Sequence, residues 1–281
     1  MYKINLDNSR FMFIVGCARS GTTFLFSILN WQKGIFCLSE DNPCLQFQPG
    51  FRDWYNDLHS EKSPTKGLYL PCFDDPDGDW AYCYDQLLER YDIVGSKYAF
   101  GPHGTYFDNK HPQDLFFDFH LRYFENSKYI CIIRRPDECI FSMSKMFPSK
   151  SYVELRDAWL RSALVSLNTY FRFENAVLIL HEHLSEETMT QIGLFIGRQL
   201  RYEKSWIIPR ESQNSAIQNL QPEIILKNSL DISELLKLYK NIHGAFNHKH
   251  LSYEGRALPH AFLNSCRRKV SSLLDGSDFS S

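Results

Sequence analysis

Short apolar runs alternate with segments of helical spacing along most of the chain. The apolar runs lie at 11–15, 35–38, 92–96, 128–133 and 176–180. Apolar residues recur at helical spacing in 22–30, 114–124, 136–145, 152–173, 185–195 and 222–246. Continuous apolar runs of this length are typical of parallel strands that are buried on both faces. Their alternation with helices predicts an α/β fold, in which helices flank a central parallel sheet.

Residues 41–90 interrupt this alternation, because prolines, aspartates and glycines separate short aromatic pieces there. We interpret the stretch as an irregular insertion over the ligand-binding edge of the sheet, and not as a second domain. We therefore expect one domain across residues 1–281, a length that α/β folds commonly reach. Beyond residue 246 the sequence is polar and predicts little structure, and the tail at 271–281 is expected to be disordered.

Composition narrows the classes of partner. The formal net charge of −2 argues against a protein that binds nucleic acid through a general positive field, so any anion site must be built locally. Met1–Arg10 is polar and does not resemble a secretion signal, and no run approaches the roughly 20 apolar residues of a membrane span. Cys17 and Cys131 lie in apolar runs and are predicted to be buried free thiols. We expect a cytoplasmic protein without nucleic-acid or membrane partners, and nothing in the sequence indicates an oligomeric state.

The strongest functional signal is Gly-Cys-Ala-Arg-Ser-Gly-Thr-Thr at 16–23, between a predicted strand and a predicted helix. Helix N-termini bind phosphate through unpaired N–H groups and the positive end of the helix dipole. Gly21 allows the backbone to approach an anion closely, and Thr22 and Thr23 add hydroxyl donors. The spacing matches a P-loop, but Thr22 replaces the Walker lysine and the basic residue is Arg19. The alternative is a helix cap after a glycine turn.

A second anion site is predicted where the strand at 128–133 ends. Arg134 follows that strand, and Pro136 is typical of the first position of a helix. Ser142 lies two helical turns further, so its hydroxyl can point toward the same anion as the Arg134 guanidinium, which suits phosphate. Arg135 is either a solvated charge or a partner of Glu138.

The segment at 13–25 resembles the 5′-phosphosulfate loop of sulfotransferases that use 3′-phosphoadenosine 5′-phosphosulfate (PAPS). It is closer to the Arg-Ser-Gly-Thr-Thr form of the bacterial and tyrosylprotein enzymes than to the Lys-Ser-Gly-Thr-Thr form of the cytosolic arylsulfotransferases. Arg-x-Pro with a serine eight positions after the arginine is similar to the 3′-phosphate motif of the family. The resemblance covers residues 10–215 in outline. It implies a three-layer P-loop-like fold, no required metal, and in-line sulfuryl transfer to a hydroxyl or amine of a small-molecule acceptor.

The resemblance also implies roles for individual residues. The implied cofactor-binding residues are Arg19, Ser20, Gly21, Thr22, Thr23, Phe24, Arg134 and Ser142. Arg19 is expected to stabilise the leaving phosphate as the product 3′,5′-adenosine bisphosphate forms. Lys97, which follows the strand at 92–96, is similar to a lysine that acts near the transferred group in family members. The alternative for Lys97 is an ordinary exposed lysine.

The general base is the least determined role. Arylsulfotransferases carry a histidine two residues after this lysine, where this chain has Ala99. Tyrosylprotein enzymes use a glutamate after the second strand, and Glu40 stands at the matching distance, so Glu40 is the first candidate. A carboxylate at the mouth of an apolar pocket has its pKa raised toward a useful value. Asp41 is the adjacent rival, while His103 and His120 are weaker candidates because a lone histidine among aromatics is more often structural.

Weaker resemblance continues further along the chain. The segment at 177–184 is similar to a strand and Tyr-Glu-Asp-Leu segment of the family, with His181 in place of tyrosine, and we interpret it as scaffold. Arg210 and Ser212 are minor candidates for completing the nucleotide site. Two rival functions stay open, a P-loop kinase or nucleotidase acting on a small molecule and a nucleotide-binding scaffold without catalysis. The substituted Walker lysine argues against the first rival.

Overall fold

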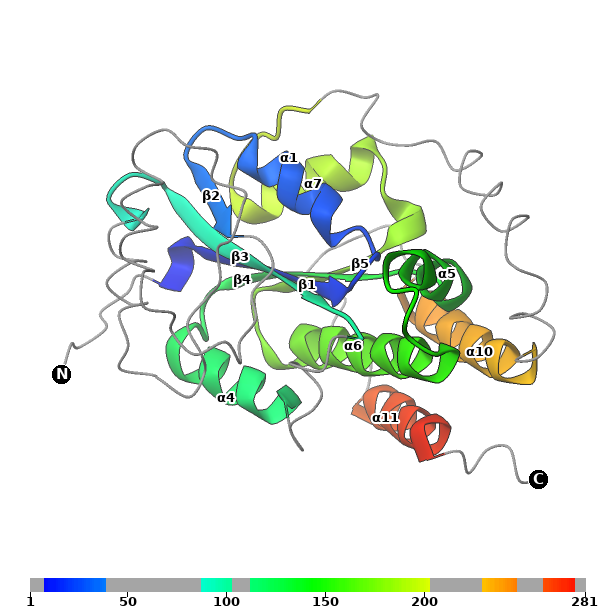
Figure 1. Ribbon diagram of the computed structural model, residues 1–281. Helices are drawn as coiled ribbons and strands as arrows, with labels where there is room; N and C mark the ends of the chain where they lie inside the picture. Colours follow the sequence, from blue (N-terminus) through cyan, green and yellow to red (C-terminus); the bar gives the residue numbers. More distant parts are fainter. Residues whose placement is uncertain (1–7, 39–86, 103–111, 203–228, 247–259, 276–281) are drawn as a thin grey trace.

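The central feature of the protein is one parallel sheet of five strands in the order β2-β3-β1-β4-β5 (Figure 1). The computed structural model describes residues 8–38, 87–102, 112–202, 229–246 and 260–275. The strands are β1 (Phe11–Cys17), β2 (Ile35–Leu38), β3 (Ile93–Phe100), β4 (Lys128–Ile133) and β5 (Ala176–Leu180). All five predicted strands are therefore confirmed. Most of the predicted insertion, residues 41–86, lies outside the described residues.

Strand β1 is the middle of the sheet and pairs in parallel with β3 and β4. Its partners run from Phe11↔Val94 to Cys17↔Phe100 on one side. Every residue of β1 is buried, because helices cover both faces of the sheet. This burial explains why the strands are continuous apolar runs with no polar alternation.

Helices form a layer on each face of the sheet (Figure 1). They are α1 (Thr22–Asn30), α4 (Pro112–Tyr123), α5 (Pro136–Met146), α6 (Tyr152–Arg172), α7 (Glu186–Ile196), α10 (Ser229–Phe246) and α11 (His260–Asp275), with short turns η1 (Asn8–Arg10) and η2 (His181–His183). Met12 and Ile14 of β1 pack toward α1 and α7, whereas Phe11, Phe13 and Val15 pack on the side of α4 and α6. The architecture is a three-layer α/β fold, with α11 packed on the outside of α6.

Two local expectations need correction. Strand β3 continues to Phe100, beyond the predicted end at Ser96, so Lys97 lies within a strand. The region after residue 246 contains α11, and the tail expected to be disordered from residue 271 is helical through Asp275. The helix forms because sparse apolar residues at helical spacing, ending with Val270 and Leu273, are buried in the core cluster that includes α6.

Candidate active site

The order of the strands selects the loop after β1 as a ligand site. From β1 the chain moves to β2 and β3 on one side of the sheet, and then crosses to β4 on the other side. In open α/β sheets, ligands bind outside the carboxyl ends of strands where the direction of winding reverses. That position belongs to β1, whose carboxyl end leads directly into residues 18–21. The topology thus places the predicted phosphate loop at the expected binding edge.

The loop turns sharply through two residues in the left-handed region. Gly21 has a φ of 102°, and Arg19, at 70°, is the non-glycine residue with positive φ in the described part of the chain. Hydrogen bonds fix the turn: the amide and the hydroxyl of Ser20 both donate to the carbonyl of Cys17, at 3.0 and 2.7 Å. Gly21 precedes α1 and contributes no side-chain cap. The first-turn N–H groups of α1 are therefore suited to an anion.

Two glycines of the loop are required by close packing. An added Cβ on Gly16 would lie 2.7 Å from the carbonyl oxygen of Ile132 and 2.8 Å from the Ser20 hydroxyl oxygen. An added Cβ on Gly21 would lie 2.8 Å from Cδ2 of His181. These contacts are shorter than van der Waals distance, so a side chain at either position would displace the loop. Gly21 is therefore required both by its positive φ and by the His181 ring that packs against it.

Lys97 is buried beneath the start of α1, with 2% of its surface exposed. Its Nζ donates to Oγ1 of Thr23 at 3.2 Å and lies 5.4 Å from the centre of the Phe26 ring. The interpretation as an ordinary exposed lysine is therefore wrong. Lys97 is directly opposite Ile14 in the sheet register, so it projects to the face covered by α1. A buried ammonium is costly without polar partners, and here the loop supplies one.

The second predicted anion site, at Arg134 and Ser142, contacts the phosphate loop directly. We call these two parts of the site its two corners. Nη1 of Arg134 donates to the carbonyl oxygen of Arg19 at 3.1 Å, and Nε of Arg19 donates to the Ser142 hydroxyl at 3.0 Å. The thiol of Cys139 donates to the carbonyl of Ala18 at 3.2 Å. Residues more than a hundred positions apart thus share one cluster at the carboxyl edge of the sheet. Guanidinium groups, hydroxyls and helix-start amides are the groups that suit a phosphorylated ligand, and they lie together here.

Arg134 is held by two further contacts. Its Nε donates to Oε2 of Glu138 at 3.1 Å, and its carbonyl oxygen accepts from Nε1 of Trp159 at 2.9 Å. Trp159 is fully buried on α6. Arg135 forms its short ion pair with Asp137 at 2.8 Å, while Glu138 lies 3.9 Å away. Of the two open interpretations of Arg135, the structure therefore supports an ion-paired side chain, with Asp137 as the nearer partner.

Among the candidate bases, only His120 lies within the described residues. Its Nδ1 and Nε2 face the hydroxyls of Tyr129 and Tyr98 at 2.9 and 3.1 Å, inside the aromatic core. Burial lowers the pKa of His120 well below its usual value. The ring packs edge-on against Phe13, on the opposite face of the sheet from Lys97. His120 is thus a structural residue. Glu40, Asp41, His103, Arg210 and Ser212 lie outside the described residues.

The sequence indicates a scaffold role for His181, yet the structure places its ring against the phosphate loop. It follows β5, and its ring edge packs on Gly21. Burial, and then the charge of Arg134, lower the pKa of His181 to about 4, so the imidazole is neutral at pH 7. The one available signal was its position directly after a predicted strand, at the same edge as the phosphate loop.

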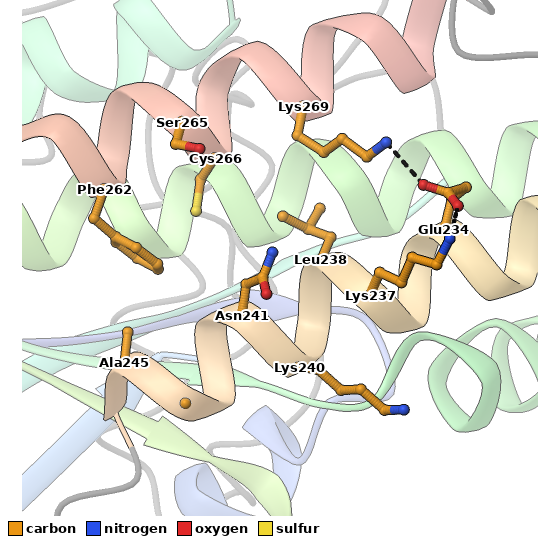
Figure 2. Close-up of a pocket in the computed structure, with 11 residues that line it drawn as sticks. Glu234, Lys237, Leu238, Lys240, Asn241, Ala245, Phe262, Ser265, Cys266 and Lys269 are labelled. Atoms are coloured by element: carbon orange, nitrogen blue, oxygen red, sulfur yellow. Dashed lines mark hydrogen bonds and ion pairs between the residues drawn. The ribbon is translucent and has the colours of Figure 1, made fainter. Parts of the chain in front are cut away.

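A groove between two helices lies apart from this site. A groove of about 610 Å³ separates α10 from α11 (Figure 2). Glu234 at one end pairs with Lys237 and Lys269, and none of the lining residues belongs to the loop, β4 or α5. Over the described ranges, no cluster of three potential ligand side chains that would hold a metal is present. Within the same ranges, no helix combines the length and apolarity needed to span a bilayer.

The sheet order, the glycine loop after the central strand and the flanking helices define a three-layer P-loop-like fold. Residues 12–192 match the model of the sulfotransferase family, and this match spans more than half of the chain and includes both corners of the site. The chain belongs to the sulfotransferase family.

A solved structure shows the same fold at low sequence identity. The sulfotransferase domain from the Synechococcus PCC 7002 olefin synthase has a TM-score of 0.51 at 16% identity, covering 98% of this chain and 96% of that one. At this identity the likeness shows a shared fold. Matches also include a sulfotransferase from Alicyclobacillus acidocaldarius, with a TM-score of 0.41, 15% identity and coverage of 80% and 96%. Sulfotransferase STF9 from Mycobacterium avium matches with a TM-score of 0.43, 11% identity and coverage of 97% and 78%. No curated protein sequence matches the chain.

Proposed function

We propose that this sulfotransferase takes its sulfuryl group from PAPS and transfers it to a hydroxyl or amine of a small-molecule acceptor. The observation that carries the proposal is the contact between the two anion-binding corners. Arg134 touches the carbonyl of Arg19, and Arg19 in turn touches Ser142. A nucleotide with phosphates on the 3′ and 5′ positions of one ribose needs two anion sites side by side, and these corners supply them.

The residues present fit such a nucleotide. No side chain caps the start of α1 after the left-handed turn at Gly21, so the helix-start amides suit a 5′-phosphate, and Arg134 with Ser142 suits a 3′-phosphate. The proposed nucleotide-binding residues are Arg19, Ser20, Gly21, Thr22, Thr23, Phe24, Arg134 and Ser142. All of these donors are N–H or O–H groups, which bind phosphate and sulfate oxygens without a metal.

PAPS, when bound, supplies the sulfuryl group and leaves as 3′,5′-adenosine bisphosphate. Arg19 and Lys97 are proposed to offset negative charge on the leaving phosphate oxygens. The burial of Lys97 strengthens this effect, because electrostatic attraction increases where water is excluded. Glu40 is proposed as the base that takes the acceptor proton, with Asp41 as its rival.

The donor nucleotide is tested by binding. We expect the full chain to be retained on immobilised 3′,5′-adenosine bisphosphate without Mg²⁺, and not on immobilised ATP. The alternative function, a P-loop kinase or nucleotidase, requires the opposite selectivity, because a Mg²⁺-bound triphosphate is the ligand of such loops. The proposal would be rejected if the chain were retained on immobilised ATP in the presence of Mg²⁺ and not on immobilised 3′,5′-adenosine bisphosphate.

The chemical roles are tested by turnover of labelled PAPS in a screen of hydroxyl and amine acceptors. Arg19→Ala is expected to abolish turnover, and Lys97→Met to lower kcat by about 100-fold or more. Glu40→Gln should remove chemistry but retain bisphosphate binding. Lys145→Met, which changes a lysine on α5 stacked on Phe141, is the matched control and should keep full activity. A near-normal rate in Glu40→Gln would mean that Asp41 or His103 is the base, because His120 is held inside the aromatic core.

We also propose a reduced, cytoplasmic compartment and no nucleic-acid or membrane partner. Each cysteine that the structure describes is a buried free thiol, which supports a reduced compartment. Fractionation of the producing cells would test this proposal, since recovery with membranes would contradict it.

A further inference from the structure

The donors of the Arg134 guanidinium are divided between different partners. Nε donates to Glu138 and Nη1 donates to the carbonyl oxygen of Arg19, both at 3.1 Å. The Arg134 and Glu138 side chains are 16% and 11% exposed, so the pair is largely shielded from water. A guanidinium is a rigid planar fork with five N–H groups. Fixing Nε and Nη1 therefore orients the whole plane, and the remaining N–H groups can still reach an anion.

The carbonyl of Arg19 requires such a partner. Arg19 adopts a φ of 70°, which is unfavourable for a residue with a side chain. In a loop whose N–H groups turn toward an anion, the carbonyl groups must turn away and find other donors. Arg134 donates to the carbonyl of Arg19, and Cys139 donates to the carbonyl of Ala18. Arg134, directly after β4, and Cys139, in α5, thus hold the backbone of the 5′-phosphate loop.

We propose that Glu138 is a positioning residue for the 5′-phosphate loop. By orienting the Arg134 guanidinium, Glu138 holds the carbonyl of Arg19 and with it the left-handed turn that presents the loop to a phosphate. The 3′ and 5′ phosphate subsites are consequently coupled through Arg134. This inference rests on the proposed function, because that function assigns both subsites to one adenosine bisphosphate.

Two other roles of Glu138 make different predictions. If Glu138 only orients Arg134 toward its own phosphate, then ligands without a 3′-phosphate are insensitive to its removal. If the negative charge of Glu138 mainly repels phosphate, then removal tightens binding of every nucleotide. Asp137 is a matched control, since it lies in the same first turn of α5, is equally shielded at 11% exposure, and pairs with Arg135.

The test is calorimetric titration of the full chain with three nucleotides. They are 3′,5′-adenosine bisphosphate, adenosine 5′-monophosphate and adenosine 3′-monophosphate. Glu138→Ala is expected to weaken binding of the 5′-monophosphate about fivefold, the effect of one lost hydrogen bond in positioning. The same substitution should weaken binding of the bisphosphate more than binding of the 3′-monophosphate. The control Asp137→Ala should change the affinity for each nucleotide by less than about twofold. Glu138→Gln keeps an acceptor oxygen and is expected to lose less than Glu138→Ala; it carries the test if Glu138→Ala does not fold.

The outcomes separate the two levels of the proposal. Loss confined to nucleotides with a 3′-phosphate, unchanged affinities, or tighter binding overall would each overturn the role of Glu138 and leave the proposed function intact. An equal loss in Asp137→Ala would also overturn it, because that result reports only charge near α5. If the folded, unaltered chain bound none of the three nucleotides, the proposed function itself would fail.

Discussion

Replacement of glycines by alanine separates the steric requirement of the phosphate loop from its backbone requirement. Gly21 has both a φ of 102° and a neighbour, Cδ2 of His181, 2.8 Å from the position of an added Cβ. Gly197 has a φ of 77° but no atom within 4 Å of its added Cβ. Gly244, on α10, has neither constraint, since nothing lies within 4 Å and its φ is ordinary for a helix. The three positions form a graded series within one protein.

The expected changes in unfolding free energy follow from these differences. Gly244→Ala should stabilise the protein by about 0.5–1 kcal/mol, because alanine is the better helix former. Gly197→Ala should cost about 1 kcal/mol for its left-handed backbone. Gly21→Ala adds about 1–2 kcal/mol of overpacking to the same backbone cost, for a total of about 2–3 kcal/mol. Urea unfolding, followed by circular dichroism, measures all three changes.

The steric part of the Gly21 effect has its own control. In a His181→Ala background, Gly21→Ala should lose most of its overpacking cost, because Cδ1 of Ile132 at 3.1 Å is then the close neighbour of the added Cβ. The two substitutions should therefore couple by about 1 kcal/mol. Nucleotide affinity should also fall in Gly21→Ala, because displacement of the loop moves the helix-start amides. Equal losses for Gly21→Ala and Gly197→Ala, with no coupling to His181, would refute the steric explanation.

Two further predictions concern stability. The folded protein holds the pKa of His181 at about 4, below the usual 6.5, so between these values the unfolded chain binds a proton that the folded protein excludes. The free energy of unfolding should therefore fall by about 3 kcal/mol from His181 alone as the pH drops from 6.5 to 4. Urea unfolding at pH 7 and at pH 4.5 measures this loss of stability, which should be smaller in His181→Phe. Asp231→Ala should lower the free energy of unfolding by about 2–3 kcal/mol, because it removes a carboxylate 3.2 Å from the buried Arg156 guanidinium. Asp157 also pairs with Arg156 but is more exposed, so an equal or larger loss in Asp157→Ala would contradict this explanation.

The sequence by itself determined which segments are strands, most of the helices between them, and the residue types at both predicted anion sites. Strand identity could be read because burial on both faces makes each strand a continuous apolar run, as in β1. The phosphate loop could be read because its glycine, hydroxyl and arginine residues are consecutive. The Arg134 and Ser142 pair was readable for a related reason, since both residues sit on one predicted strand end and the helix that follows.

Tertiary structure alone decided how these local pieces meet. The burial of Lys97 depends on α1 covering β3, and the contact of His181 with Gly21 depends on β5 lying next to β4. Helix α11 has apolar residues too sparse to predict alone, and it forms on the surface that α6 offers. The left-handed turn at Arg19 is unfavourable locally and is stabilised because the guanidinium of Arg134, far away in the chain, donates a hydrogen bond to the carbonyl oxygen of Arg19. Such contacts join residues far apart in the chain, so no local pattern encodes them; they arise when the sheet brings its strand ends to one edge.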